Sequence, residues 1–203
     1  MAFSRNSFRR TCIAALGAAL ALAFGASNAF ASCSYSSIGK TFSQWNDPAY
    51  YVPAPNGGLE SGNSGWALSS SSVVSQNESF YLGGSRDDSS LYIPTGGSAT
   101  SPAFCVEQGM PTFRFTVRNT GDRGATMKVE AIYLDSTHNN ATKTLGYQTA
   151  GYWWGPSAKM SLAIGTASNG GINASQVQLR FTPVSGSGKF QVDDLYIDPW
   201  ARY

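Results

Sequence analysis

Hydrophobic and polar residues alternate strictly along several short segments of this chain. In TFRFTVRN (residues 112–119), phenylalanine and valine occupy one set of alternate positions, and arginine and threonine occupy the other. Successive side chains of a β-strand point to opposite faces, so this alternation predicts strands with one buried and one exposed face. The same pattern assigns further residues to buried faces: Met127, Val129, Ala131 and Tyr133; Met160, Leu162 and Ile164; and Val177, Leu179 and Phe181.

Clusters of Gly, Ser, Asn and Pro separate ten segments that we predict to be strands. No window longer than two turns carries a helical period, so we expect almost no helix after residue 31. Many short strands with regular turn signals are typical of antiparallel sandwiches and barrels. We predict an all-β fold, a two-sheet antiparallel β-sandwich of the jelly-roll type, with strands at residues 65–69, 72–76, 79–83, 89–94, 112–119, 126–135, 143–149, 159–165, 177–183 and 189–198.

The last predicted strand contains two adjacent acids, Asp193 and Asp194, in the segment FQVDDLYID (residues 190–198). Its apolar residues occupy even positions before the acids and odd positions after them. A strand cannot bury both sets on one face unless an extra residue lies between them, so we predict a β-bulge or a switch of faces here. The two carboxylates would then converge on one point. Alternatively, one faces solvent while the other accepts backbone hydrogen bonds.

A partner for these acids lies early in the chain, in NGGLESGNSGW (residues 56–66), where Glu60 follows a pair of glycines. Calcium prefers carboxylate and main-chain carbonyl oxygens in flexible coordination. We therefore predict a structural calcium site formed by Glu60 with Asp193 or Asp194, which would join the first and last strands. The alternative is that these acids are simply solvated, as acidic loop residues commonly are.

The first 31 residues have the pattern of a cleaved export signal. Arg5, Arg9 and Arg10 precede an apolar run at residues 12–26, and AFA (residues 29–31) fits a cleavage site before Ser32. The apolar run of 15 residues is shorter than the roughly 20 needed to span a bilayer. We expect a secreted, extracellular protein without a membrane span after cleavage, exported by the Sec or the twin-arginine route. Residues 32–203 should form one domain.

Removal of this segment changes the charge and the cysteine count. Lys plus Arg falls from 14 to 11 while Asp plus Glu stays at 12, so the formal net charge falls from +2 to −1. Scattered charges with this balance provide no electrostatic footprint for nucleic acid. Cys33 and Cys105 remain as an even pair in an oxidising compartment, and we predict a disulfide between them. Its loop of about 73 residues would contribute roughly 4 kcal/mol by restricting the unfolded chain.

The motifs around these acids resemble those of a known class of domain. NGGLESGNSGWALS resembles the opening segment, and FQVDDLYID the closing strand, of carbohydrate-binding modules of the family 4/9/22 type and related galactose-binding-like domains. Leu59 stands where that opening segment usually has phenylalanine. The resemblance implies a jelly roll with structural calcium, held by Glu60 and one of Asp193 and Asp194. SSLYIPTGGSATSPAFCV, PTFRFTVRNTG and VQLRFTPVSGSGKFQVDDLYIDP resemble a group of small secreted actinobacterial proteins of undetermined function.

Catalysis finds little support in the sequence. The single histidine, His138, lies in a predicted hairpin loop, and no Gly-x-Ser-x-Gly elbow is present. These features do not support a nucleophilic triad, and one histidine with two paired cysteines cannot supply a zinc site. Glu107, Glu130 and Asp135 leave a carboxylate-based, glycan-active enzyme as an alternative, which would need two carboxyl groups about 5 Å apart.

Carbohydrate binding is the function that the aromatic residues favour, because sugars stack their apolar faces on aromatic rings. The densest aromatic cluster is GYWWGPS (residues 151–157). If it continues a strand, Tyr152 and Trp154 point one way and Trp153 the other, and we predict that Trp153 is exposed. Tyr147, Arg114 and Arg118 are further ligand-binding candidates on an open sheet face, and an extracellular or cell-wall polysaccharide is the expected partner. An extracellular surface or matrix protein without a small ligand is the alternative, in which these rings only pack the sandwich.

Overall fold

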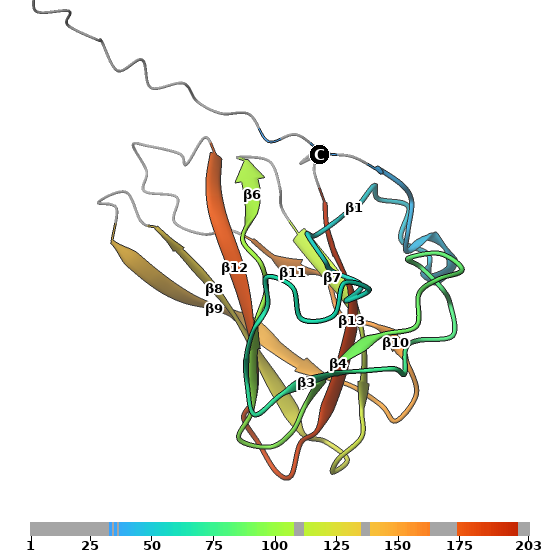
Figure 1. The fold of residues 1–203 in the computed structure, drawn as a ribbon, viewed down its shortest axis with the longest axis vertical. Helices are drawn as coiled ribbons and strands as arrows, with labels where there is room; N and C mark the ends of the chain where they lie inside the picture. The colour runs from blue at the N-terminus through green and yellow to red at the C-terminus, as the bar shows by residue number, and fades with distance from the viewer. Residues whose placement is uncertain are drawn as a thin grey trace, which may run out of the picture.

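The computed structural model describes residues 33, 35, 37–107, 112–134, 139–162 and 174–198, and these form two antiparallel β-sheets (Figure 1). The first sheet has seven strands. Its main path runs β10 (Gly155–Pro156), β7 (Thr112–Asn119), β13 (Phe190–Ile197), β4 (Ser90–Ile93), β3 (Ser72–Val74), while β1 (Val52–Pro53) also pairs with β13 and β11 (Met160–Ser161) with β7.

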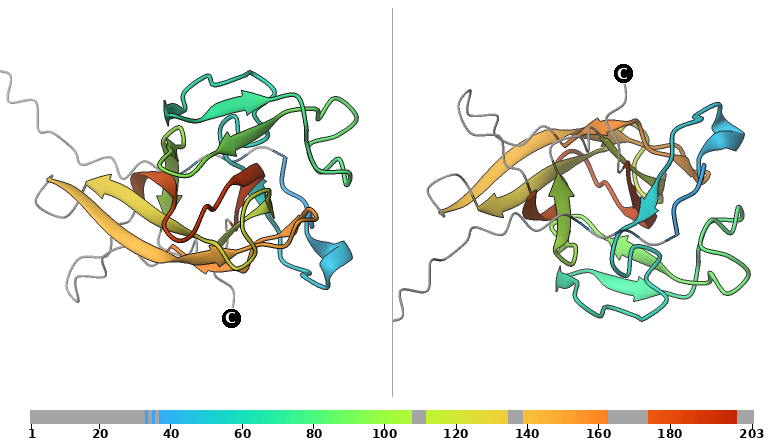
Figure 2. Two further views of the ribbon diagram at one scale, coloured as in Figure 1. Left: turned by 90° about the horizontal axis from the view of Figure 1, so that it is seen from below. Right: turned by 90° about the horizontal axis from the view of Figure 1, so that it is seen from above.

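The second sheet has six strands. Its path runs β2 (Ala67–Ser69), β5 (Ser98–Thr100), β12 (Ala174–Pro183), β8 (Thr126–Leu134), β9 (Asn140–Thr149), and β6 (Phe104–Glu107) also pairs with β12. The chain crosses repeatedly from one sheet to the other, which is the connectivity of a jelly roll. Figure 2 shows the two layers of strands with the interior between them. The predicted fold class, an all-β two-sheet antiparallel sandwich, is confirmed.

The alternating pattern of the sequence fills the space between the sheets. The odd-numbered residues of β7 are buried, and so are the alternate residues from Met127 to Ala131 in β8 and from Val177 to Phe181 in β12. Phe115 and Phe181 meet edge to face across the two sheets, with ring centroids 5.2 Å apart. Each such side chain contributes roughly 1.5–3 kcal/mol of burial free energy, so these rows hold the sheets together.

The outer face of the first sheet is partly covered by the N-terminal part of the chain. This part carries a 3-10 turn, η1 (Ser43–Trp45), drawn in blue at the right of Figure 1. Phe42, Tyr51 and Tyr196 form a second hydrophobic cluster there. The core packs against one side of β13, this cover packs against part of its other side, and every residue of β13 is buried.

The strand prediction differs from the structure at one predicted segment and at four short strands. Residues 79–83 form turns, so the strand predicted there is wrong. The carboxylate of Glu78 accepts the backbone N–H groups of Phe80 and Leu82, which a neighbouring strand would otherwise use. The short strands β1, β5, β6 and β10 were not predicted.

The disulfide predicted between Cys33 and Cys105 is present, with Cα atoms 5.6 Å apart. It ties the chain before η1 to β6 of the second sheet. The export signal at residues 1–31, the hairpin loop with His138, and Ile164 lie outside the described residues. In the part of the chain that is described, no helix is long and apolar enough to cross a membrane.

Candidate functional site

β13 changes its inward and outward parity at the two adjacent acids. The pairing of β13 with β7 shifts register between Asp193 and Tyr196, and Asp194 has a φ of 54°. This left-handed conformation accommodates the extra residue of a bulge. The bulge predicted from the positions of the apolar residues is therefore confirmed, and it lets Leu195 return to the core.

The glycine-rich turn near residue 57 packs directly against this bulge. β4 pairs with the first half of β13 and β1 with its end, which leaves the bulge between them. There the N–H of Ala54 donates to the Leu195 carbonyl at 2.9 Å, and the N–H of Leu195 donates to the Gly57 carbonyl at 3.1 Å. A Cβ atom on Gly58 would lie 3.7 Å from Oδ1 of Asp194. The predicted approach of this turn to the acids is thus present.

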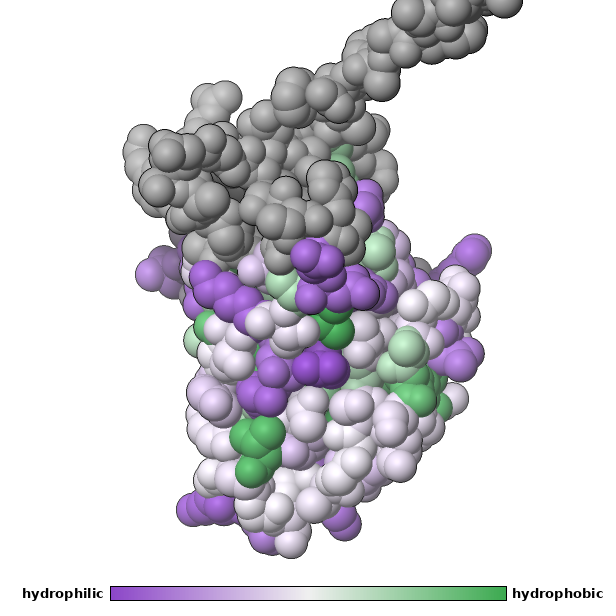
Figure 3. All heavy atoms as spheres, turned by 90° about the vertical axis from the view of Figure 1, so that its left-hand side faces the viewer, coloured by the Kyte–Doolittle hydropathy of each residue, from purple (hydrophilic) through white to green (hydrophobic). Residues whose placement is uncertain are grey.

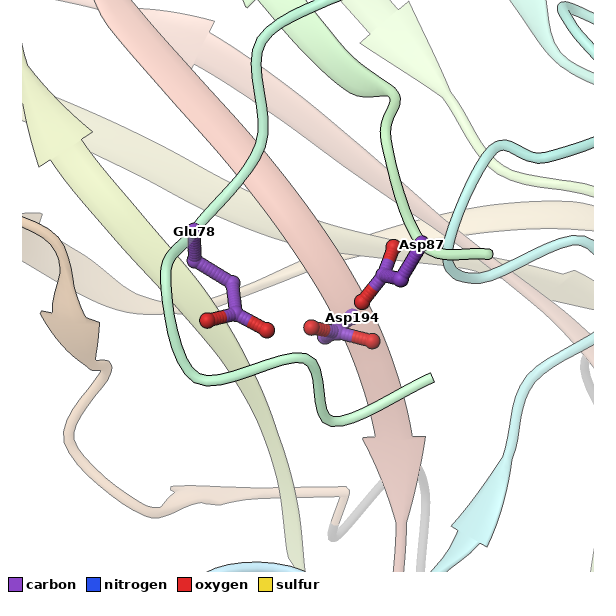
Figure 4. Close-up of side chains that lie close together, drawn as sticks. All are labelled: Glu78, Asp87 and Asp194. Carbon is purple, nitrogen blue, oxygen red and sulfur yellow. The ribbon is translucent and has the colours of Figure 1, made fainter. Parts of the chain in front are cut away.

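Three buried carboxylates gather at the bulge, and Figure 4 shows them pointing toward one another. They are Glu78 and Asp87, from the loop between β3 and β4, and Asp194 from β13. One oxygen from each lies within 4.8 Å of the others. All three residues are at most 2% exposed. We call this group the acidic cluster.

The hydrogen bonds of the acidic cluster leave some of its oxygens without a partner. Glu78 accepts N–H groups with both oxygens, and Oδ2 of Asp87 accepts the N–H of Gly83 at 3.1 Å. Oδ1 of Asp87 and Oδ2 of Asp194 are buried and make no hydrogen bond. Within the described ranges, no lysine or arginine forms an ion pair with the cluster. Buried charges without such partners are costly by several kcal/mol each.

This burial perturbs the protonation of the cluster. Burial, with the charges of Glu78 and Glu60 added, raises the pKa of Asp87 to about 6. Burial also raises the pKa of Asp194 far above its ordinary value, and the neighbouring charges of Asp87 and Glu78 raise it further. Asp87 and Asp194 therefore need either protons or a cation to stay buried beside one another near neutral pH. Converging carboxylate oxygens with unused lone pairs fit a calcium ion.

Of the three predicted calcium ligands, only Asp194 belongs to the acidic cluster. Glu60 is exposed, and its Oε1 accepts the N–H groups of Asp88 at 3.0 Å and Ser89 at 2.9 Å. Asp193 is fully buried but pairs across the sheet with Thr116, and its Oδ1 accepts the N–H of Asp194. Glu78 and Asp87 were missed, because they flank the segment that was taken for a strand.

Two exposed aromatic rings flank a shallow hollow before β10. Trp153 is 88% exposed and Tyr152 is 49% exposed. Arg123 lies over the Tyr152 ring, 5.7 Å from its centroid. The hollow has a volume of about 270 Å³ and is lined by Arg123, Ala150, Gly151, Tyr152 and Trp153. We call it the aromatic hollow.

The exposure of Trp153 agrees with the prediction, but its neighbours are arranged differently. Residues 152 and 153 form a bend and not a strand, so the alternation of faces that a strand would impose on Tyr152, Trp153 and Trp154 does not apply. Trp154 is partly buried beneath Arg118, whose guanidinium lies 5.1 Å from the ring centroid. Tyr147 is 62% exposed, on β9 of the second sheet, where it pairs with Lys128.

Arg114 does not lie on an open face, contrary to prediction. The N-terminal part of the chain covers it, and its Nη1 forms an ion pair with Asp47 at 2.7 Å. Burial alone would raise the pKa of Asp47, but hydrogen bonds from Lys159, Tyr51 and Arg114 lower it to about 2. Arg114 also donates to the Ser157 carbonyl. It therefore stabilises the cover and is not available to a ligand.

Arg118 lines an open groove on the same sheet face. The groove has a volume of about 430 Å³ and is lined by Val74, Ser75, Gln76, Tyr92, Arg118, Thr120 and Gln191. We call it the arginine groove. It lies over β3, β4, β13 and β7, beyond the part of the face that the N-terminal segment covers.

The outer face of the second sheet carries Glu130, one of the three carboxylates considered for catalysis. Figure 3 views this side, and hydrophilic residues gather across the middle of it. Glu130 forms ion pairs with Lys128 at 2.8 Å and Arg180 at 2.9 Å. Burial alone would raise the pKa of Glu130, but these two cations lower it, whereas a general acid needs a raised pKa. Asp135 and the side chain of Glu107 lie outside the described residues.

Comparison with known proteins adds distant structural likenesses. The sequence matches no protein-family model and no curated protein. The fold is similar to the CBM22-1–GH10 modules of xylanase Xyn10B from Clostridium thermocellum, at 16% identity over 70% of this chain and 27% of that one, with a TM-score of 0.48. It is also similar to the tailspike protein 4 of bacteriophage CBA120, at 14% identity over 71% of this chain and 21% of that one, with a TM-score of 0.48.

A third similar structure is the CBM22-1 xylan-binding domain of Paenibacillus barcinonensis Xyn10C, at 10% identity over 68% of this chain and 88% of that one, with a TM-score of 0.48. The chain thus spans about a quarter of the first structure and a fifth of the second. Carbohydrate-binding modules are among the solved structures that the fold resembles, as the sequence motifs indicated. No ligand or activity follows from likenesses at these scores.

Proposed function

We propose that this protein is a secreted, non-catalytic β-sandwich that binds carbohydrate at the aromatic hollow. The exposure of Trp153 carries the proposal, because an indole that is 88% exposed contributes almost nothing to the core. Tyr152 presents a second exposed ring beside it, and Arg123 supplies hydrogen-bond donors at the rim. Sugar-binding sites combine these features, since one face of a sugar ring is apolar while its hydroxyl groups need polar partners.

The alternative is an extracellular surface or matrix protein without a small ligand. Such a protein would present a flatter apolar patch to its partner. The aromatic hollow is small and combines two rings with a guanidinium and exposed backbone, which favours a sugar over a broad protein surface. A glycan-active enzyme is less favoured, because Glu130 is held as an ionised partner of two cations.

A glycan array probed with residues 32–203 tests the proposal. We expect reproducible binding that Trp153→Ala weakens at least about fivefold, because truncating a central aromatic contact costs more than about 1 kcal/mol. Tyr50→Ala removes an exposed ring from the N-terminal part of the chain and serves as a matched control. If glycan binding were instead lost only in a Tyr147→Ala variant, the binding site would lie on the second sheet. A blank array would favour the interaction-protein alternative.

We further propose that the acidic cluster holds a structural calcium ion. Three observations support this proposal: the carboxylates converge, one oxygen each of Asp87 and Asp194 has no hydrogen-bond partner, and no ion pair among the described residues reaches the cluster. The ion would supply the positive charge that the buried acids require. Glu78 and Asp87 would then fasten the loop between β3 and β4 to the bulge of β13.

Thermal unfolding with and without calcium tests this second proposal. Calcium should raise the Tm, with a stabilisation of about 2.7 kcal/mol at a hundredfold excess over Kd. Asp194→Asn should abolish the shift while keeping the backbone, since asparagine tolerates the left-handed conformation. Glu60→Gln should retain the shift, because Glu60 lies outside the cluster. An unchanged Tm of the wild-type protein at saturating calcium would refute the metal site.

A further inference from the structure

The arginine groove is lined by hydrogen-bonding groups without any acid. Besides Val74, the groove around Arg118 is lined by Ser75, Gln76, Tyr92, Thr120 and Gln191, and no aspartate or glutamate of the described residues lines it. The groove is open to solvent because the N-terminal cover extends only over the Arg114 end of β7. It can therefore admit a ligand without any rearrangement of the fold.

Arg118 is held rigidly inside this groove. Its Nε donates to Oε1 of Gln191, and its Nη2 donates to Oε1 of Gln76 at 3.1 Å. The ring of Trp154 supports the guanidinium from one side, at 5.1 Å. A guanidinium has five N–H donors, so three of them remain without a partner among the described residues. A preorganised fork of this kind loses little entropy when it binds an anion.

The charge of Arg118 has no counterion in the part of the chain that is described. Arg114 pairs with Asp47 and Arg180 with Glu130, whereas among the described residues Arg118 bonds only to neutral amide oxygens. Burial lowers the pKa of Arg118, which reflects the cost of removing an unpaired charge from water. An anion in the groove would relieve that cost and accept the unused N–H groups.

We propose that the arginine groove binds the carboxylate of an acidic sugar residue, a uronate, with Arg118 as its partner. A planar carboxylate matches the guanidinium fork in bidentate geometry, and the hydroxyl and amide groups of the groove suit the remaining sugar hydroxyls. Trp154, beneath Arg118, is the chain neighbour of Trp153, which lines the aromatic hollow. The inference rests on the proposed carbohydrate binding and names the class of carbohydrate.

Calorimetric titration with a short oligogalacturonate and with its carboxyl-reduced counterpart tests the inference. The wild-type protein should bind the acidic oligosaccharide at least about tenfold more tightly, the range expected for a charge-assisted hydrogen bond. Its affinity should fall with added salt. Arg118→Gln should bind both oligosaccharides equally, and Arg118→Lys should keep part of the preference. Arg86→Gln removes one exposed positive charge elsewhere and should leave the preference intact.

The outcomes separate this inference from the proposed function. One outcome is that the wild type binds both oligosaccharides equally and that Trp153→Ala abolishes the binding of both. That result would overturn the uronate site and support the aromatic hollow. A preference that survives in a folded Arg118→Gln would also overturn it. A sulfated oligosaccharide without carboxyl groups is a third probe. If it binds more tightly than the oligogalacturonate, the groove recognises a sulfate and the uronate assignment is overturned. Failure of the wild type to bind any of the three would overturn the uronate site, while the glycan array separately decides the proposed binding at the aromatic hollow.

Discussion

Asp194 combines two unfavourable conditions in one residue. It is 1% exposed, and its backbone adopts a left-handed conformation that costs roughly 1–2 kcal/mol for a residue other than glycine. Strained and buried acids persist only where the surroundings compensate for them. The turn at Gly57 offsets the cost of the strained backbone through its hydrogen bonds with Leu195. A bound cation would offset the cost of the buried charge.

The raised pKa values predict how stability depends on pH in the absence of metal. Because the pKa of Asp87 rises from 3.8 to about 6 on folding, the native state binds more protons than the unfolded state between those values. Stability should therefore fall as pH rises through this window, by roughly 1–3 kcal/mol for Asp87 alone. The raised pKa of Asp194 extends the loss to higher pH.

Unfolding in chelator at a series of pH values from about 4.5 to 8 checks this prediction. The Tm should decline with pH in chelator and should not decline in saturating calcium, because the cation takes the place of the protons. Asp87→Asn should flatten the decline in chelator. A Tm in chelator that rises across the whole range would contradict the assignment of these pKa directions.

Sequence patterns located some residues of the candidate sites but not their partners. Trp153 and the adjacent acids stood out because aromatic clusters and a broken alternation are visible along the chain. Glu78 and Asp87 did not, since they reach Asp194 only through the path of a long loop. Arg114 and Arg118 occupy equivalent outward positions of β7, yet one is covered and the other open. That difference depends on a segment more than sixty residues away.

At the scale of elements, the bulge of β13 and the turn at Gly57 form one unit. Their contact is backbone to backbone, through the two hydrogen bonds between Ala54, Gly57 and Leu195. Glycine is required at position 57 because a Cβ atom there would lie 2.5 Å from the Leu195 carbonyl oxygen. The unit also sets the distance from Gly58 to the acidic cluster.

Gly57→Ala should therefore push this turn away from β13. We expect a destabilisation of about 1–3 kcal/mol, as for other overpacked sites, together with weaker calcium binding. Urea denaturation and calcium titration measure the two effects. Gly155→Ala is the matched control, because a Cβ atom there meets nothing within 4 Å. Its stability should stay within about 0.5 kcal/mol of the wild type. Equal stability of Gly57→Ala would show that the turn can shift without cost.

Strands with a long alternating pattern were predictable, and short ones were not. β7 spans the predicted residues 112–119, and β8 and β12 differ from prediction only at their ends. β1 and β10 have two residues each, which is too short for any period to be visible. Residues 79–83 carry strand-forming residues, but the Glu78 carboxylate turns the chain there.

At the scale of the whole molecule, the two faces of the first sheet have different roles. Its inner face packs the core, while its outer face is divided between the N-terminal cover and the arginine groove. The acidic cluster joins the loop between β3 and β4, which carries Glu78 and Asp87, to Asp194 in the bulge of β13. A calcium ion at this cluster would therefore stabilise the sheet whose open part carries the arginine groove.

The sequence by itself determined the all-β sandwich, the buried rows of β7, β8 and β12, the disulfide and the bulge at the two adjacent acids. All of these follow from local periodicity or from the pairing of two cysteines. Only the tertiary structure decided which carboxylates meet, which arginine is covered and where the aromatic rings face solvent. Those outcomes depend on loops whose paths are set by long-range packing and hydrogen bonding, and no short segment of the chain encodes such a path.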